Sequence, residues 1–212
     1  MQISNPLSGI KKLAGQTIWY GMSSIFGRFL NYLLTPLLTT IFFADDYGVI
    51  SLLFGYAAFL NIIFTYGMET SYFRFASIEP EKKVYNTASS SLWISTILFS
   101  ILLFGFREPL ASFIDISHHP EYITWTILIV ALDTLAVMPF AKLRYEQRPR
   151  KYAFIKILNI LINIGLILFF LVFCKNEYEN NPGSTWAKLY DPGIGLGYVF
   201  IANLAASGIT IL

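Results

Sequence analysis

The stretch that decides the fold is Tyr152–Phe173, which reads YAFIKILNILINIGLILFFLVF. Most of its side chains are large and apolar, and the strongly polar interruptions are Lys156, Asn159 and Asn163. A helix of about 20 such residues is long enough to cross the roughly 30 Å of hydrocarbon in a bilayer. A helix also satisfies its own backbone hydrogen bonds, which lipid cannot do. The stretch is therefore predicted to be a membrane-spanning helix.

Five more apolar segments of comparable length surround it, and polar or turn-forming residues such as Asp45-Asp46-Tyr47-Gly48 separate them. They are too long and too continuously apolar for the alternating strands of an outer-membrane barrel. We predict an all-α integral membrane protein, a six-helix transmembrane bundle that forms one lobe over residues 1–212. The last span reaches Leu212 without a polar flank, so we expect a fragment or truncated chain without its second lobe. The predicted spans are 13–43, 49–75, 84–106, 123–141, 152–173 and 194–212.

Composition supports this class and excludes several others. Charged residues make up 13% of the chain and hydrophobic residues 55%, whereas soluble domains carry about 25% charged residues. The net charge of +2 gives no indication of a nucleic-acid partner. The single Cys174 excludes an intrachain disulfide, and the adjacent His118 and His119 do not have the spacing of metal ligands. We expect no metal and no cofactor.

The basic residues predict the orientation, because cytoplasmic loops of membrane proteins carry an excess of Lys and Arg. With the N-terminus in the cytoplasm, nine basic residues near the span ends lie inside and three lie outside. The inside set is Lys11, Lys12, Lys82, Lys83, Lys142, Arg144, Arg148, Arg150 and Lys151, and the outside set is Arg107, Lys175 and Lys188.

The first span carries a continuous polar stripe. Its members recur every three or four residues, so they lie on one face of a helix. Arg28 is near the middle of the span, where an arginine costs about 2.5–3.5 kcal/mol to insert. We expect it to face a wet cavity; the alternative is an ion pair with Glu69 or Asp133. Pro36 interrupts the span and is predicted to be a hinge, with a static bend as the alternative. The stripe is Gln16, Tyr20, Ser24, Arg28, Asn31, Thr35 and Thr39.

Other spans carry polar residues at helical spacing as well. Three cations and two carboxylates within the spans leave a slight positive excess, which suits an anionic, sugar-bearing ligand. Pro139 is expected to end the helix of the fourth span. These residues are Asn61, Thr65, Glu69, Tyr72 and Arg74 in the second span, Asp133 in the fourth, Tyr152, Lys156, Asn159 and Asn163 in the fifth, and Asn203, Ser207 and Thr210 in the sixth.

Three patches resemble one family of membrane proteins. Ala44-Asp45-Asp46-Tyr47-Gly48 resembles the acidic-Tyr-Gly turn of polysaccharide flippases, which belong to the multidrug/oligosaccharidyl-lipid/polysaccharide exporter superfamily. Residues 67–75, GMETSYFRF, look like their Gly-x-Glu-Thr-x-aromatic-Phe-Arg segment. Residues 143–152, LRYEQRPRKY, resemble their basic loop between the fourth and fifth spans. The resemblance covers residues 13 to about 165.

The resemblance implies a fold and a function. Members have 12 to 14 spans in two lobes around a central cavity, so this chain would be the N-terminal lobe. They carry an undecaprenyl-pyrophosphate-linked oligosaccharide from the cytoplasmic to the periplasmic leaflet of the bacterial inner membrane. The expected partners are this lipid-linked substrate, membrane lipids and other polysaccharide-assembly proteins, and no catalytic residue is expected.

On this interpretation, Arg28 attracts the pyrophosphate with support from Arg74 and Lys156. A second group, Asn31, Asn159 and Asn163, would hydrogen-bond the sugar or headgroup. Glu69 and Asp133 either carry a coupling H⁺ or Na⁺ or form fixed pairs with the arginines. Three alternatives stay open: a cation-coupled drug exporter of the same superfamily, a membrane enzyme of polysaccharide assembly, and a scaffold that recruits such enzymes.

Overall fold

The computed structural model describes residues 18, 21–22, 25–26, 29–30, 32–116 and 118–211. Within these residues the chain forms helices and no strand, which confirms the all-α class. The helices are Tyr32–Ile41, α2 (Ala44–Thr65), α3 (Met68–Ala76), α4 (Glu81–Gly105), α5 (Arg107–Phe113), α6 (Glu121–Tyr145), α7 (Pro149–Leu168), the π-helix η1 (Phe169–Cys174), α8 (Lys175–Asn180), the 3₁₀-helix η2 (Ala187–Leu189) and α9 (Gly197–Ile211).

Prolines and acidic residues mark where the longer helices begin. Pro80 precedes α4 and Pro120 precedes α6, and each is followed by a glutamate in the first turn. Pro149 is itself the first residue of α7. Proline lacks the N–H that a helix start leaves unpaired, and a carboxylate interacts favourably with the positive end of the helix dipole. These helices therefore start where the local sequence favours a start.

Length and surface together make this a membrane protein. Four helical stretches of the described chain are long and apolar enough to cross a bilayer, namely Asp45–Ala76, Glu81–Gly105, Glu121–Tyr145 and Pro149–Asn180. Large apolar side chains such as Ile94 and Ile101 are more than half exposed on α4, and an exposed apolar surface on a helix of this length is typical of a lipid-facing surface. Tyr32–Ile41 is the continuous described part of the predicted first span, and the described part of the predicted sixth span is the shorter apolar helix Gly197–Ile211. The count of six spans stays a prediction.

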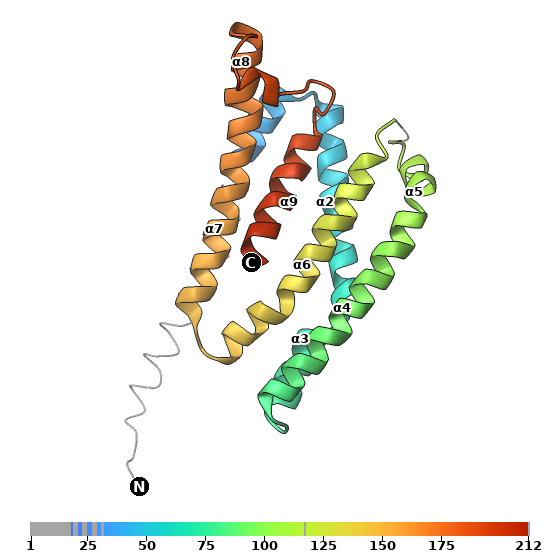
Figure 1. Cartoon of the computed structure of the whole chain (residues 1–212), viewed down its shortest axis with the longest axis vertical. Coiled ribbons are helices and arrows are strands. Elements are labelled where there is room, and N and C mark those ends of the chain that lie inside the picture. The colour runs from blue at the N-terminus through green and yellow to red at the C-terminus, as the bar shows by residue number, and fades with distance from the viewer. Residues whose placement is uncertain are drawn as a thin grey trace.

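Helix α6 is the centre of the bundle. It contacts α2, α3, α4, α5, α7 and α9, and α9 lies between α6 and α7 (Figure 1). The largest core cluster joins α2, α6, α7 and α9 around the fully buried Phe200. A second cluster, around the fully buried Tyr72, joins α3 and α4 to the end of α6.

Three details differ from the sequence predictions. The second span is not one helix, because Tyr66 and Gly67 adopt left-handed backbone conformations (φ 33° and 73°) that separate α2 from α3. Pro139 does not end a helix, since α6 continues through it to Tyr145. The polar break at 107–121 contains a short helix, α5. Loss of one backbone hydrogen bond at a proline is tolerated in a bundle whose neighbouring helices support the same segment.

Basic residues gather at one end of the bundle. The α3–α4 turn and the α6–α7 loop lie at the lower end of Figure 1, and the described basic residues that were predicted to be cytoplasmic lie in that loop or in the helix ends beside the turn and the loop. Arg107 in α5, Lys175 in α8 and Lys188 in η2 belong to the opposite end. Lys11 and Lys12 lie outside the described residues.

Candidate functional site

A polar cavity of about 280 Å³ lies between four helices of the bundle. On α7 and α9 its polar residues recur at steps of three or four, and such steps keep side chains on one face. The cavity is therefore formed where the polar faces of several helices meet. The polar lining residues are Asn61 of α2, Asp133 and Arg144 of α6, Tyr152, Lys156 and Asn159 of α7, and Asn203, Ser207 and Thr210 of α9.

Asp133 and Lys156 bring opposite charges to this cavity. The Ser207 hydroxyl donates a hydrogen bond of 2.9 Å to Oδ1 of Asp133, which ties α9 to α6. The Lys156 ammonium lies 4.8 Å from the centre of the Phe140 ring and interacts electrostatically with Asp133. It takes part in none of the salt bridges of the described residues. Lys156 is thus a cation in the cavity without a directly bonded carboxylate in that part of the chain.

The uncharged groups of the cavity hold the helices together and offer further hydrogen bonds. The Asn159 amide donates to the Thr210 hydroxyl at 3.1 Å, which joins α7 to α9. The same Thr210 hydroxyl bonds to the backbone carbonyl of Ala206 at 3.0 Å. Amides and hydroxyls can both donate and accept, so this wall can pair with the hydroxyls of a sugar.

Arg144 occupies the end of the cavity that is nearest the α6–α7 loop. Its Nη1 lies 2.6 Å from Oε1 of Glu69 on α3, and the two side chains are 36% and 30% exposed. The guanidinium carbon lies 5.5 Å from the centre of the Tyr152 ring. Its Nε is buried and has no hydrogen-bond partner. Arg144 therefore lies between an ion pair and the polar cavity.

A second cavity of about 370 Å³ lies next along the bundle, between Tyr32–Ile41, α2, α7 and α9. Thr35, Asn163 and Asn203 contribute polar groups to it, and Asn203 lines the first cavity as well. The buried side-chain oxygen of Asn163 has no hydrogen-bond partner. The polar lining of the bundle therefore continues from one cavity to the next.

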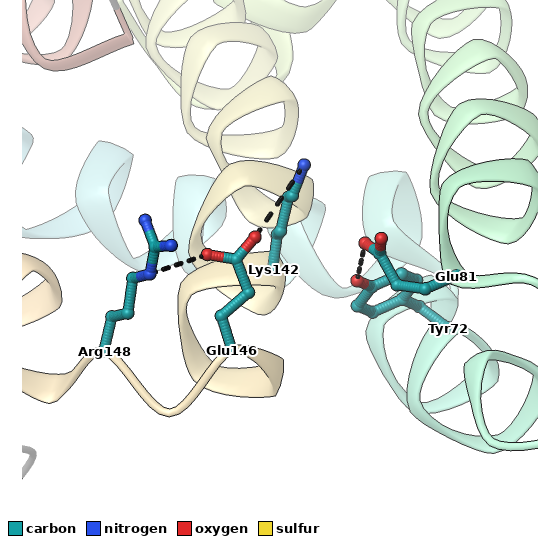
Figure 2. Close-up of polar contacts among 5 residues, drawn as sticks. All are labelled: Tyr72, Glu81, Lys142, Glu146 and Arg148. Atoms are coloured by element: carbon teal, nitrogen blue, oxygen red, sulfur yellow. Dashed lines mark hydrogen bonds and ion pairs between the residues drawn. The ribbon is translucent and has the colours of Figure 1, made fainter.

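Polar contacts outside the cavity fasten the same end of the bundle (Figure 2). Glu146 pairs with Arg148 at 2.9 Å and with Lys142 at 3.9 Å. The Tyr72 hydroxyl donates to Glu81 at 2.8 Å and links α3 to α4. None of these five residues lines the polar cavity. Substitutions at these residues can therefore serve as controls for substitutions in the cavity.

Comparison with known proteins assigns a family. Residues 16–179 match the profile of the family described as "Polysaccharide biosynthesis protein", which is 164 of the 212 residues. The chain belongs to this family. No curated protein and no solved structure gave a match. The matched range extends from the first predicted span to α8, and membership gives the protein a role in the synthesis or export of polysaccharide.

In this polysaccharide biosynthesis protein, the predicted site residues divide into three groups. Asp133, Lys156 and Asn159 line one cavity, with Asn163 in the adjoining one. Glu69 and Arg74 line neither cavity: Glu69 is paired with Arg144, and Arg74 is exposed on α3. The remaining two, Arg28 and Asn31, lie outside the described residues.

The predicted hinge, Pro36, lies inside the helix Tyr32–Ile41 and is exposed. The Thr40 hydroxyl donates to the carbonyl of Pro36 at 2.7 Å, and the Thr39 hydroxyl approaches the same oxygen at 3.1 Å. These bonds stabilise the local turn, and movement at Pro36 stays a prediction.

Sequence reasoning missed Arg144 as a cavity residue of this family member. It was assigned to the cytoplasmic loop, because the fourth span was expected to end at Ala141. A signal was present, since positions 133, 137, 140 and 144 follow each other at helical steps and all four line the cavity. Among the described residues, no group of three or more His, Cys, Asp or Glu could hold a metal ion.

Proposed function

We propose that this protein is a flippase, which moves an undecaprenyl-pyrophosphate-linked oligosaccharide from the cytoplasmic to the periplasmic leaflet of the bacterial inner membrane. It would contribute one lobe of a two-lobed transporter that works by alternating access, with its N-terminus in the cytoplasm. Family membership supports a role in polysaccharide export, and the gathering of basic residues at one end of the bundle supports the orientation.

The polar cavity is the observation that carries this proposal. Charged and amide side chains inside a membrane bundle are costly unless they face water or polar partners. Here they line adjoining cavities, where Lys156 interacts electrostatically with Asp133 and Arg144 lies at the end nearest the α6–α7 loop, paired with Glu69. Two cations with one carboxylate favour an anionic headgroup, and the asparagines and hydroxyls suit the sugars attached to it. The polyprenyl tail would stay in the surrounding lipid.

No chemical step is part of this proposal, because transport needs binding and movement and no bond is made or broken. Arg28 remains the proposed anion-binding residue of the first span, and Asp133 is a candidate for carrying a coupling H⁺ or Na⁺. The Ser207 hydrogen bond holds the Asp133 carboxylate toward the cavity.

The test replaces the cavity cation Lys156 and the proposed anion-binding residue Arg28 in the full-length protein, in cells that lack their own flippase for the same glycan. We expect Lys156→Ala and Arg28→Ala each to lower surface polysaccharide at unchanged protein level. Lys151→Ala is the matched control, because Lys151 is an exposed lysine on the same helix that does not line the cavity. Normal surface glycan in both Lys156→Ala and Arg28→Ala, at normal protein level, would refute the proposal.

A further inference from the structure

The side chain of Arg144 belongs both to an ion pair and to the wall of the polar cavity. Its Nη1 is bonded to Glu69 on α3, while the side chain also lines the polar cavity. Its Nε–H is buried and lacks an acceptor. A buried donor without a partner is unfavourable, so the guanidinium is incompletely satisfied in this arrangement. An additional acceptor would complete it once the side chain turns further into the cavity that it lines.

The chemistry of the guanidinium says which acceptor fits. Arginine presents five N–H groups in a planar fork that matches the oxygens of a phosphate in pairs. One carboxylate oxygen of Glu69 lies against Nη1, which leaves the other donors of the fork available. Lys156 adds a second cation to the same cavity and forms no salt bridge with a described residue. Together they can receive a group that carries more than one negative charge.

The depth of Arg144 fits the phosphates of a lipid. Arg144 is the second-last residue of α6 and lies eleven positions after Asp133. Eleven residues of α-helix correspond to about 16 Å along the helix axis. This is roughly half of the hydrocarbon thickness. The cavity therefore extends from the headgroup level at Arg144 toward the middle of the bilayer at Asp133. A polyprenyl-linked pyrophosphate, whose tail stays in the hydrocarbon, carries its phosphates at the level of Arg144.

We propose that Arg144 and Lys156 form the site that first takes up the phosphoryl groups of the lipid-linked substrate, and that Glu69 occupies Arg144 until phosphate displaces it. This inference rests on the proposed function and adds a residue pair that acts as a switch. With no substrate bound, the guanidinium pairs with Glu69. With substrate bound, it turns into the cavity and completes its hydrogen bonds on phosphate oxygens.

The fold allows the ion pair to open without separating the helices. Tyr145, the next residue, donates its hydroxyl to the backbone carbonyl of Ala76 at 2.8 Å. The ring of Tyr145 also lies 5.6 Å from that of the buried Tyr72. These contacts hold α3 against α6 independently of Glu69. A fixed structural clamp is the rival explanation of the Arg144–Glu69 pair, and it predicts a different pattern of variant effects.

Binding measurements on the full-length protein in nanodiscs separate the two explanations. The probes are undecaprenyl pyrophosphate in the bilayer and inorganic pyrophosphate in solution. Arg144→Gln should weaken binding of the lipid probe by about tenfold or more, the loss expected for a charge-assisted hydrogen bond. Glu69→Gln should tighten it several-fold, because the competing carboxylate is gone. Arg148→Gln should change it less than about twofold, since Arg148 pairs with Glu146 outside the cavity.

The opposite signs expected for Arg144→Gln and Glu69→Gln are the decisive result. If Arg144→Gln and Glu69→Gln both weaken binding and both lower the melting temperature, the pair is a clamp and the inference is wrong. Unchanged affinity in Arg144→Gln would also overturn it, and would leave the flippase proposal standing. Should Arg144→Gln fail to fold, Glu69→Gln decides alone, because only tighter binding agrees with displacement.

The two probes distinguish the source of the phosphate. If the wild-type protein binds undecaprenyl pyrophosphate more tightly than inorganic pyrophosphate, the inference is supported. If it binds inorganic pyrophosphate equally or more tightly, the site belongs to a soluble ligand and the inference is overturned. If the wild-type protein binds neither probe, the inference and the substrate class in the proposed function are both wrong.

Discussion

Replacement of Gly197 by alanine should destabilise the start of α9, where this helix packs on α6. A Cβ atom at this position would lie 2.6 Å from Cη2 of Trp125 and 2.9 Å from Cγ2 of Ile194, whereas carbon atoms pack at about 3.5–4.0 Å. The indole must therefore shift by about 1 Å. It is confined by the rings of Tyr122 and Phe200, whose centres lie 5.7 and 6.5 Å away. Overpacking of this kind costs about 1–3 kcal/mol.

That cost corresponds to a melting temperature lower by roughly 3–10 °C for a chain of this size. Cys174 can report it, because this single cysteine is fully buried and reacts with a thiol-reactive dye after unfolding. Gly165→Ala is the control, since no atom lies within 4 Å of a Cβ at that position in α7. Alanine favours a helix interior by about 1 kcal/mol over glycine, so the control should melt at the same temperature or higher.

The reasoning is wrong if Gly197→Ala melts no lower than the wild type. A second variant tests the cause, because adding Trp125→Leu to Gly197→Ala removes the ring atoms that would clash. Trp125→Leu alone should be destabilising, and the alanine should then add little further loss. Full additivity of the two losses would show that the indole is not what the alanine meets.

Three further substitutions test local contacts. Tyr198→Phe removes the hydroxyl that accepts the Asp191 N–H at 2.7 Å and should destabilise the loop before α9 by about 1 kcal/mol. Hydrogen exchange in this loop should become faster, and unchanged exchange would contradict the bond. Tyr145→Phe removes the 2.8 Å bond to the Ala76 carbonyl, so exchange at the end of α3 should rise by about fivefold, and equal rates would count against it. Gly67→Ala places a side chain at φ 73° and should cost about 1–2 kcal/mol, measured as a lower melting temperature; no decrease would refute the strain.

The sequence predicted those parts of the fold that lipid imposes. The predicted spans 84–106 and 123–141 lie within α4 and α6 or overrun them by one residue, because the length of an apolar helix is set by bilayer thickness. The break at Tyr66–Gly67 was not predicted, since nothing in the hydropathy of the second span changes there. The continuation of α6 through Pro139 depends on neighbouring helices, which a single-sequence pattern does not contain.

The site was predictable only one helix at a time. Helical spacing places Lys156, Asn159 and Asn163 on one face of α7, and the structure assigns them to two adjoining cavities. The bond between Ser207 and Asp133 joins residues 74 positions apart. Such a contact depends on how each helix is rotated about its own axis, and packing sets that rotation. Arg144 was missed for the related reason that its helix was expected to end before it.

The π-helix Phe169–Cys174 should allow the fifth span to lose one residue without a change of register, which an ordinary α-helix does not allow. Removing one residue from an α-helix rotates everything beyond it by about 100°. In a π-helical turn, loss of one residue can instead convert the segment to α-helical geometry and leave the flanking helices in register. Relatives with one residue fewer at this point should therefore keep the same polar face on α7. The stack of Phe170 on Tyr198, with ring centres 5.0 Å apart, is the contact that such a deletion would change.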